Sequence, residues 1–441
     1  MRSSNSLWIL ALSLWAAALG IAVMFASGAP IPLGRYIPQS DLMADYAYGV
    51  IAAVICYAFI MICPVNPLDR IALLVVWSIK VTVALVFMLF YENFYWFLDS
   101  YSYFAEPRLP SFSWDGLIIG QGTENIYNLI WLYYRVFPES FHTLKVLFGF
   151  AGLWAVYLFY RAAVLVLGRP DLRLLYLLSL FPSILFWSST LGKEPIALLG
   201  IGLYAYGAVA WYGRGRPGAL ILLSVGVVIA VLVRPWLGPI LLVPLLIKYL
   251  FARHGILTKA VVIAFGMGAL AYTLALVWEQ FAIETTRDLL ESLDVTSRQF
   301  SFGGSGQELA ADLTQPLQLI AALPLAMFTA LFRPLPGEIA NVFGFLAGIE
   351  NLALLALLAV AIKRFRRTDL NDPAITWAVL LILVWTLAYA FISYQNLGTA
   401  IRFRLQILPV LLAALLYFAR NRAPGRMQTG DDSQARVTPG T

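Results

Sequence analysis

Cysteine and histidine are nearly missing from this chain, which has only two of each among its 441 residues. Cys56 and Cys63 fall in, or at the end of, one apolar run. Inert core thiols are the expected state there, rather than a disulfide or a metal site. Neither His142 nor His254 has a second suitable ligand nearby, so we expect no zinc site. No resident metal or other cofactor is predicted, and a bound divalent cation is left open.

Charged residues are also scarce. They make up 12% of the chain, whereas 61% is hydrophobic and the mean hydropathy is +0.80. A soluble domain of this length needs more surface charge, so the composition indicates a polytopic membrane protein. A glycine-rich phosphate loop and a basic stripe with interleaved aromatics are both missing from the sequence. Their absence argues against a nucleotide-binding domain and against nucleic-acid binding.

Long apolar runs are abundant instead. A hydrocarbon core about 30 Å thick needs roughly 20 apolar residues per helix, and about twelve runs approach that length. They are 7–27, 46–64, 71–91, 142–166, 174–191, 195–212, 218–234, 236–251, 258–279, 342–362, 375–394 and 405–419. The first run lacks a convincing small-residue cleavage site, which favours a retained helix over a removed signal peptide. Segment 317–333 is apolar too but ends in FRPLPGE, which favours a re-entrant or interfacial piece.

These runs predict an all-α, polytopic transmembrane helical bundle with no internal repeat. Residues 1–419 would form one membrane-embedded domain, and the polar residues 420–441 a disordered tail. Two longer polar loops, 92–141 and 280–316, separate groups of runs.

Lysine and arginine bias sets the orientation. The run KRFRR at 363–367, the turn GRGRPG at 213–218 and the tail fall on one side if the twelve spans are right. That side is predicted to be cytoplasmic, with both termini on it. The loops 92–141 and 280–316 then face outward, which in a bacterium means the periplasmic side of the inner membrane.

Asp99 lies in the aromatic segment ENFYWFLDSYSYFAEP, which starts at Glu92 as the preceding run ends. A carboxylate at a membrane edge suits a general base, or a binder of an acceptor hydroxyl, acting on a membrane-bound substrate. A helix N-cap is the simpler alternative. Tyr101 and Tyr103 could stack on a sugar, and an interfacial aromatic belt explains them equally well.

Lys193 and Glu194 occupy a short turn in FWSSTLGKEP, between two apolar runs. The turn is about four residues long, so it stays near headgroup depth, where charges usually pair or bind something. The alternative is a plain solvated hairpin.

Four arginines stand at outward ends of apolar runs, where the positive-inside bias disfavours them. They are Arg234 in VLVRPW, Arg333 in LFRPLPGE, and Arg402 and Arg404 in NLGTAIRFR. Snorkelling to lipid phosphates is one explanation. The other is that their guanidinium forks hold a phosphate or pyrophosphate. Glu338 of FRPLPGE is a further possible site residue. Spacing i, i+2 puts Arg402 and Arg404 on different helix faces, whereas an extended turn would let them face one way.

Glu350 is the one acid in the interior of a predicted span, with Asn341 and Asn351 nearby. An intramembrane carboxylate usually faces a cavity or a partner. An arginine, or Lys80 in the middle of its own span, could be that partner.

The order of these features resembles the GT-C superfamily of integral-membrane glycosyltransferases, over roughly 90–240. Asp99 matches the early outward acid of that family, although it follows the third span here rather than the first. The other matching stretches are GTENIYNLIWLYYRVFP, YLFYRAAVLVLGRP and FPSILFWSSTLGKEP. FRPLPGE and GTAIRFR further resemble turns of uncharacterised exopolysaccharide-cluster members.

The resemblance implies a GT-C-like fold with short periplasmic interfacial helices. It also implies transfer of a sugar from a polyprenyl-phosphate-linked donor to an extracytoplasmic glycan or lipid acceptor. Asp99 would be the base, and Glu194 would shape or bind the acceptor or the sugar. The cations that would bind the leaving phosphate are Lys193, Arg234, Arg333, Arg402 and Arg404.

Two other functions fit the same composition. A polysaccharide polymerase or ligase of the Wzy/O-antigen-ligase type would use outward arginines and an undecaprenyl-pyrophosphate donor without relying on an early aspartate. A lipid-linked-sugar flippase or transporter would need charges along a mid-membrane path, for which only Lys80 and Glu350 qualify.

Overall fold

The structure, a computed structural model, describes residues 2–215, 217–250, 256–280, 285–299, 301, 305–307 and 312–420. Within these residues the fold is all-helical, as predicted, and the one β contact is an isolated bridge between Gly306 and Asn396. The predicted disordered tail (from 421 on) and His254 lie outside the described residues.

The helices follow one another with short connections. The first group is α1 (Arg2–Ser27), α2 (Pro30–Leu33), α3 (Leu42–Ile62), α4 (Pro67–Thr82), the π-helix η1 (Val83–Phe87), α5 (Met88–Phe94), α6 (Asp99–Ala105), the 3₁₀ helix η2 (Glu106–Arg108), α7 (Gly122–Tyr134) and α8 (Phe141–Leu167). The second is α9 (Leu172–Leu180), α10 (Pro182–Trp187), α11 (Lys193–Arg214), α12 (Pro217–Val233), α13 (Leu237–Leu250), α14 (Ile256–Gln280) and α15 (Thr286–Gln299). The last is α16 (Pro316–Phe332), α17 (Val342–Arg364), the 3₁₀ helix η3 (Arg367–Asn371), α18 (Pro373–Gln395), α19 (Leu397–Arg404) and α20 (Leu408–Ala419).

Eight helices among the described residues are long and apolar enough to cross a membrane, so the chain has the make-up of a multi-pass membrane protein. They are Asn5–Ser27, Leu42–Ile62, Pro67–Phe94, Phe141–Leu167, Lys193–Gly213, Lys259–Glu279, Val342–Arg364 and Pro373–Gln395. A ninth would be the pair α19 and α20, which is bent by 73°.

The expected count of twelve spans is therefore not confirmed. The predicted span 174–191 is broken into α9 and α10 at Phe181–Pro182. Proline lacks the N–H that continues a helix and pushes the residue before it to extended backbone, here φ −60° and ψ 123° at Phe181. The runs 218–234 and 236–251 form α12 and α13, whose 17 and 14 residues are shorter than a full span.

The apolar segment 317–333 forms α16, which packs against the last turns of α18. Leu313, just before α16, and Ala326 within it share a small apolar cluster with Ala390 and Phe391. Arg333, just after α16, lies 3.4 Å from Gln307 through Nη2, and the Gln307 backbone N–H donates to Gln395 at the end of α18. The C-terminal end of α16 therefore lies near the end of α18, and the interfacial or re-entrant character of this segment stays a prediction.

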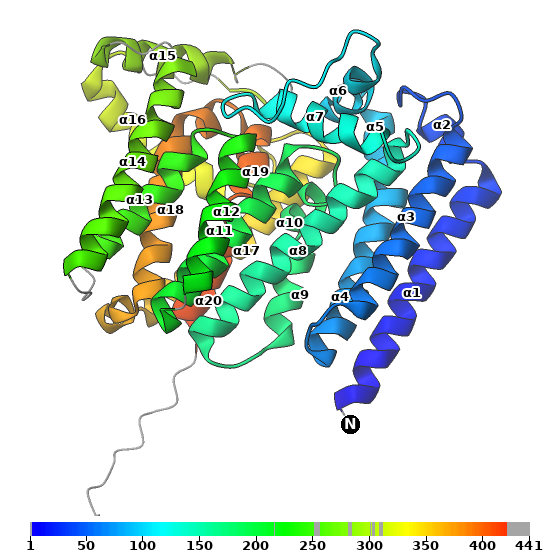
Figure 1. Ribbon diagram of the computed structural model, residues 1–441, viewed down its shortest axis with the longest axis horizontal. Coiled ribbons are helices and arrows are strands. Elements are labelled where there is room, and N and C mark those ends of the chain that lie inside the picture. The colour runs from blue at the N-terminus through cyan, green and yellow to red at the C-terminus, as the bar shows by residue number, and fades with distance from the viewer. Residues whose placement is uncertain are drawn as a thin grey trace, which may run out of the picture.

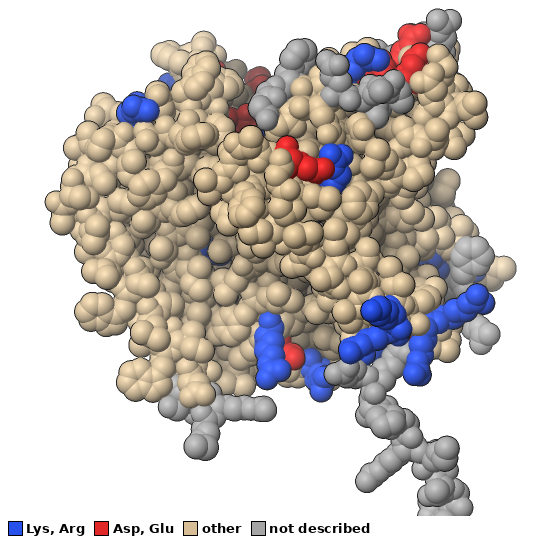
Figure 2. All heavy atoms as spheres, turned by 180° about the vertical axis from the view of Figure 1, so that it is seen from behind, with Lys and Arg blue, Asp and Glu red and all other residues tan. Residues whose placement is uncertain are grey.

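The spans stand side by side, and short helices cover one end of the bundle (Figure 1). α2, α6, α7 and α15 lie at the upper end in that view, whereas the N-terminus of α1 lies at the lower end. Seen from behind, lysine and arginine gather along the lower edge, below a broad uncharged belt (Figure 2). A basic end and an uncharged belt are typical of a membrane-embedded bundle.

α11 and α12 pack closely because glycines face the contact. A Cβ on Gly226 of α12 would lie 2.4 Å from the Tyr204 backbone nitrogen and 2.5 Å from the Gly200 carbonyl oxygen of α11. Small residues let helix backbones approach in lipid, where van der Waals contact drives association. This contact fixes the relative positions of two residues described next, one at the start of α11 and one just after α12.

Candidate functional site

Charged residues from four distant parts of the chain meet at the upper end of the bundle. Asp99 is the first residue of α6, and Glu194 is the second residue of α11. Arg234 directly follows α12, and Arg402 lies in α19. We call these four residues the outer ion cluster.

Two arginines converge on one glutamate in this cluster. Glu194 Oε1 accepts hydrogen bonds from Arg402 Nε at 2.6 Å and from Arg234 Nη2 at 2.9 Å. Arg402 also reaches Asp99, with 2.7 Å between Nη1 and Oδ2. Arg402 therefore bridges both carboxylates, through separate nitrogens of one guanidinium fork.

Burial divides the cluster into an inner and an outer half. The side chains of Glu194 and Arg234 are 4% and 5% exposed, whereas those of Asp99 and Arg402 are 52% and 27% exposed. Buried charges must be paired, and Glu194 and Arg234 are paired with each other. The outer half leaves a carboxylate and a guanidinium accessible to a substrate.

Arg234 has unused hydrogen-bonding capacity. Its Nε and Nη1 have no hydrogen-bond partner among the described residues, although the side chain is buried. The guanidinium lies over the Phe403 ring, 4.4 Å from its centroid. Because a buried guanidinium normally satisfies its donors, these two nitrogens are candidates to bind water or an anionic ligand.

A non-helical segment between α10 and α11 places Glu194. Lys80, which is 2% exposed, donates through Nζ to the Ser188 carbonyl at 3.0 Å and to the hydroxyls of Ser188 and Ser189 at 2.6 and 3.0 Å. These contacts hold the segment against α4. A glutamate in the first turn of α11 also complements the positive end of the helix dipole.

Lys193 points to a different neighbour. Its Nζ donates to Thr123 Oγ1 of α7 at 2.6 Å. α7 begins against the end of α12, because a Cβ on Gly122 would lie only 2.0 Å from the Val233 carbonyl oxygen. The predicted residue Lys193 therefore lies beside the outer ion cluster and ties it to the helices that cover this end.

A cavity of about 230 Å³ adjoins the outer ion cluster. Asp99, Glu194 and Arg402 line it together with aromatic and apolar side chains of α5, the residues just before α6 and the segment around Trp187. A larger groove of about 540 Å³ lies next to it and is lined mainly by apolar and aromatic residues. The cavity and the groove share Tyr91, Trp187 and Arg402 as walls, so Arg402 stands at their junction.

The groove runs between parts of the bundle that are irregular. Val83 and Phe87 of the π-helix η1 line it on one side, and residues of α10, α17 and α19 line the others. π-helical turns occur often at functional sites, where they displace a side chain from regular helix register.

Arg404 lies outside the outer ion cluster, so the four predicted arginines do not form one group. Arg404 is completely buried and donates through Nη1 to the Leu331 carbonyl at 2.8 Å. Its Nη2 lies 3.8 Å from Glu350 Oε1, and Glu350 Oε2 accepts from the backbone and hydroxyl of Ser183. The helical α19 turns Arg402 and Arg404 to different sides, as their i, i+2 spacing predicts for a helix.

Arg333 and Glu338 form a third, separate pair. Arg333 Nε donates to Glu338 Oε1 at 2.8 Å, and the Leu335 backbone N–H donates to Glu338 Oε2 at 2.6 Å. Partial burial raises the pKa of Glu338, but the hydrogen bonds from Arg333 and Leu335 outweigh it and lower the pKa below its ordinary 4.5. This pair closes the turn after α16.

The two predicted tyrosines, Tyr101 and Tyr103, are buried near the cavity but do not line it. Tyr101 is buried and its hydroxyl donates to the Glu92 carbonyl at 2.8 Å. Tyr103 is buried as well; burial, and then the charges of Glu194 and Asp99, raise its pKa. Tyr91 and Trp187, rather than these tyrosines, line the cavity.

Glu92 is a wall of the cavity that sequence reasoning missed. It is 2% exposed, and Lys145 Nζ of α8 donates to both carboxylate oxygens at 2.9 and 2.8 Å. An acid at the end of an apolar run beside Asn93 and aromatics was the available signal.

No group of three or more His, Cys, Asp or Glu side chains in the described part of the chain could hold a metal ion.

No family model matches the sequence, and neither a curated protein nor a solved structure matches it.

Proposed function

We propose that this chain is a glycosyltransferase of the bacterial inner membrane, with the outer ion cluster as its active site on the periplasmic side. The donor would be a sugar linked to polyprenyl phosphate, and the acceptor an extracytoplasmic glycan or lipid. The observation that carries the proposal is the junction at Arg402, where a charged cavity joins an apolar groove.

A lipid-linked sugar phosphate has the matching parts. The isoprenoid chain would lie in the apolar groove, and the sugar in the cavity that Asp99 and Glu194 line. The phosphate between them would then lie at Arg402, whose guanidinium is partly exposed. Guanidinium groups bind phosphate oxygens through charge-assisted hydrogen bonds.

The chemistry assigned to each residue follows from its exposure. Asp99, half exposed, accepts the proton of the acceptor hydroxyl as that oxygen bonds to the anomeric carbon. The bond from the anomeric carbon to the phosphate oxygen breaks, and polyprenyl phosphate leaves with the bonding electrons. Arg402 stabilises the charge that grows on the leaving phosphate. Glu194, which is buried and also paired with Arg234, holds Arg402 in place.

The remaining predicted residues receive structural roles in this proposal. Arg404 with Glu350, and Arg333 with Glu338, are already paired away from the outer ion cluster. They fix α19 and the turn after α16. In this proposal Arg402 is therefore the main residue that binds the leaving phosphate, and the buried Arg234 lies deeper in the site.

The test is Asp99→Asn in the purified protein, reconstituted in lipid with a polyprenyl-phosphate-linked sugar and a glycan acceptor. We expect transfer to fall at least about a hundredfold, the contribution typical of a general base, while folding is unchanged. Asp115→Asn, an exposed acid of the same 92–141 loop, is the matched control and should keep full activity. Full activity of Asp99→Asn would refute the assigned base.

Cells supply a second test of the same proposal. Mass spectrometry of lipid-linked oligosaccharides should show an unprocessed intermediate in cells that lack this protein or carry Asp99→Asn. Identical lipid-linked pools in cells with and without the protein would contradict a glycan-transferring enzyme.

A polymerase or ligase of the Wzy/O-antigen-ligase type is the second candidate. It is favoured by the two arginines on Glu194 and by the unpartnered nitrogens of Arg234, which suit a pyrophosphate. Loss of transfer in Arg402→Gln together with normal transfer in Asp99→Asn would select it.

A flippase or transporter finds less support. Lys80 donates to Ser188 and Ser189, and Glu350 accepts from Ser183 and lies 3.8 Å from Arg404, so both charges have polar partners within the protein. Vesicle flux of a lipid-linked sugar without a covalent product would favour this class.

A further inference from the structure

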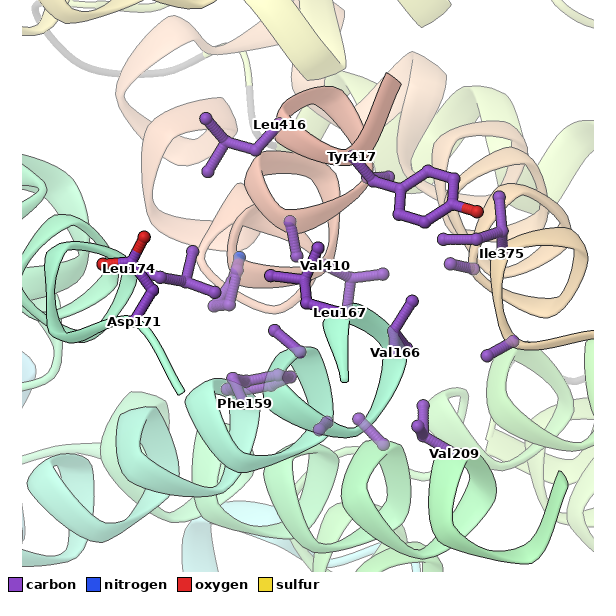
Figure 3. Close-up of a pocket in the computed structure, with 18 of the residues that line it drawn as sticks. Phe159, Val166, Leu167, Asp171, Leu174, Val209, Ile375, Val410, Leu416 and Tyr417 are labelled. Atoms are coloured by element: carbon purple, nitrogen blue, oxygen red, sulfur yellow. The ribbon is translucent and has the colours of Figure 1, made fainter. Parts of the chain in front are cut away.

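A separate cavity of about 280 Å³ lies between α8, α9, α11, α18 and α20 (Figure 3). Its walls come from the last turns of α8, the first turn of α18 and most of α20. These are the ends of the helices remote from the outer ion cluster, on the side of the molecule where the N-terminus of α1 lies. We call this cavity the inner crevice.

Small side chains leave the inner crevice open. Ala163 of α8, Ala205 of α11, Ala378 of α18 and Ala414 of α20 all line it. α8 ends at Gly168, which takes the left-handed conformation with φ 70°, and the chain then turns back into α9. Short side chains on helices that meet at such a turn leave space that the protein does not fill.

The wall and the mouth of the crevice differ in chemistry. The wall is built from aliphatic and aromatic side chains such as Phe159 and Val410 (Figure 3). Among its lining residues are also Arg169, Arg173 and Arg420, against a single acid, Asp171. Arginines exceed acids in this lining, so an apolar interior is combined with a cationic mouth.

The three guanidinium groups at the mouth differ in whether they already form an ion pair within the protein. Arg420 is held by Asp369, with 2.9 Å between Nη2 and Oδ1, and its guanidinium lies 3.5 Å from the centroid of the Tyr417 ring. Arg169 and Arg173 are exposed, and neither forms an ion pair within the described residues. They are available to an anion.

The acid at the mouth, Asp171, makes a local hydrogen bond to the backbone. Asp171 caps α9, since its Oδ1 accepts from the Arg173 backbone N–H at 3.0 Å. Within the described residues Asp171 forms no ion pair with the arginine side chains, and one acid leaves the three arginines with a net positive charge.

We propose that the inner crevice binds an anionic phospholipid of the leaflet at this end, with an acyl chain between the helices and the phosphate on Arg169, Arg173 and Arg420. The ends of the long apolar helices place the mouth near headgroup depth. Basic pockets between transmembrane helices recognise anionic lipid heads, and guanidinium forks bind phosphate oxygens. This site is independent of the proposed transfer chemistry.

The experiment uses the full chain, purified in detergent and delipidated, with phosphatidylglycerol or phosphatidylcholine added back. Native mass spectrometry should detect one retained phosphatidylglycerol, and the apparent melting temperature should rise with its concentration. Phosphatidylcholine, whose head is neutral overall, should bind about tenfold more weakly. Inorganic phosphate should leave the melting temperature unchanged, because it has no chain to fill the crevice.

The double variant Arg169→Gln/Arg173→Gln should weaken phosphatidylglycerol binding about tenfold and abolish the preference over phosphatidylcholine. Lys363→Gln/Arg367→Gln is the matched control, since it removes two exposed charges at the same end but outside the crevice. Ala163→Leu should reduce lipid retention without changing charge. Equal binding of both lipids by the unmodified chain, equal loss in the control, or stabilisation by inorganic phosphate would each overturn the proposal.

Discussion

Glu194 is the residue on which the candidate site depends most. It is almost fully buried, yet it accepts hydrogen bonds from two arginines that come from positions 40 and 208 residues away along the chain. Removing its charge would leave Arg234 buried without a counter-ion. A buried charge that loses its partner is strongly destabilising, because the desolvation penalty is no longer offset.

We therefore predict that Glu194→Gln destabilises the protein by about 3 kcal/mol or more. Thermal unfolding in detergent would measure this as a lowered melting temperature. Glu139→Gln is the control, because Glu139 pairs with Arg108 at 2.7 Å but both side chains are substantially exposed. That change should alter stability by less than about 1 kcal/mol. Equal losses in the two variants would mean that Glu194 is not a buried partner.

A small pH effect belongs to the Arg333–Glu338 pair. The folded pKa of Glu338 lies below 4.5, so the pair contributes stability that is present above that pH and is lost as pH falls through the folded pKa. Wild-type protein should thus lose more stability than Glu338→Gln between pH 6 and about pH 3. Melting temperatures of both proteins across that range are the measurement. Parallel pH profiles would contradict the assigned ion pair.

At the scale of elements, the contact between α11 and α12 sets the distance between Glu194 and Arg234. α11 carries Glu194 in its first turn, and Arg234 directly follows α12. The two helices lie close because Gly226 brings one backbone within reach of the other. Any side chain at that glycine would separate the two charged residues.

Gly226→Ala is predicted to destabilise the protein by about 1–3 kcal/mol through overpacking. It should also reduce transfer activity, because Arg234 would be drawn away from Glu194. Gly213→Ala is the matched control, since a Cβ there meets nothing within 4 Å. That change should be neutral or stabilising, up to about 1 kcal/mol, because alanine favours the helix. The measurements are the melting temperature and the transfer activity of both variants. An unchanged melting temperature in Gly226→Ala would disprove the tight contact between α11 and α12.

The whole molecule has two chemically different ends. Short helices, among them α6 with Asp99, cover one end, and a basic rim with the inner crevice forms the other. From the positive-inside bias we expect the basic rim to lie on the cytoplasmic side. The proposed active site would then face the periplasm, where a glycan acceptor would be found.

Cysteine labelling tests that orientation. In a Cys56→Ala/Cys63→Ala background, Ser113→Cys should react with a membrane-impermeant maleimide on intact cells. Thr368→Cys in η3 should react only after lysis, because it lies on the basic end. Both residues are exposed, so access depends on the side of the membrane alone. The reverse labelling pattern would place the outer ion cluster in the cytoplasm and exclude a periplasmic site.

The sequence allowed the charged residues of the outer ion cluster to be predicted one by one. Asp99, Glu194, Arg234 and Arg402 were candidates because each is a charge at the end of an apolar run, and the structure brings them together. Arg404 looked equivalent to Arg402, yet it forms a buried pair with Glu350. Position along a run does not tell which way a side chain turns.

The sequence by itself determined the class of protein, the all-helical fold and the basic end, because these follow from composition and from the length of apolar runs. The break at Phe181–Pro182 has a local cause in proline, although 174–191 was predicted as one run. Only the tertiary structure decided which arginine meets which acid, the junction of cavity and groove, and the inner crevice. These depend on contacts between residues such as Asp99 and Arg402, which local patterns do not encode.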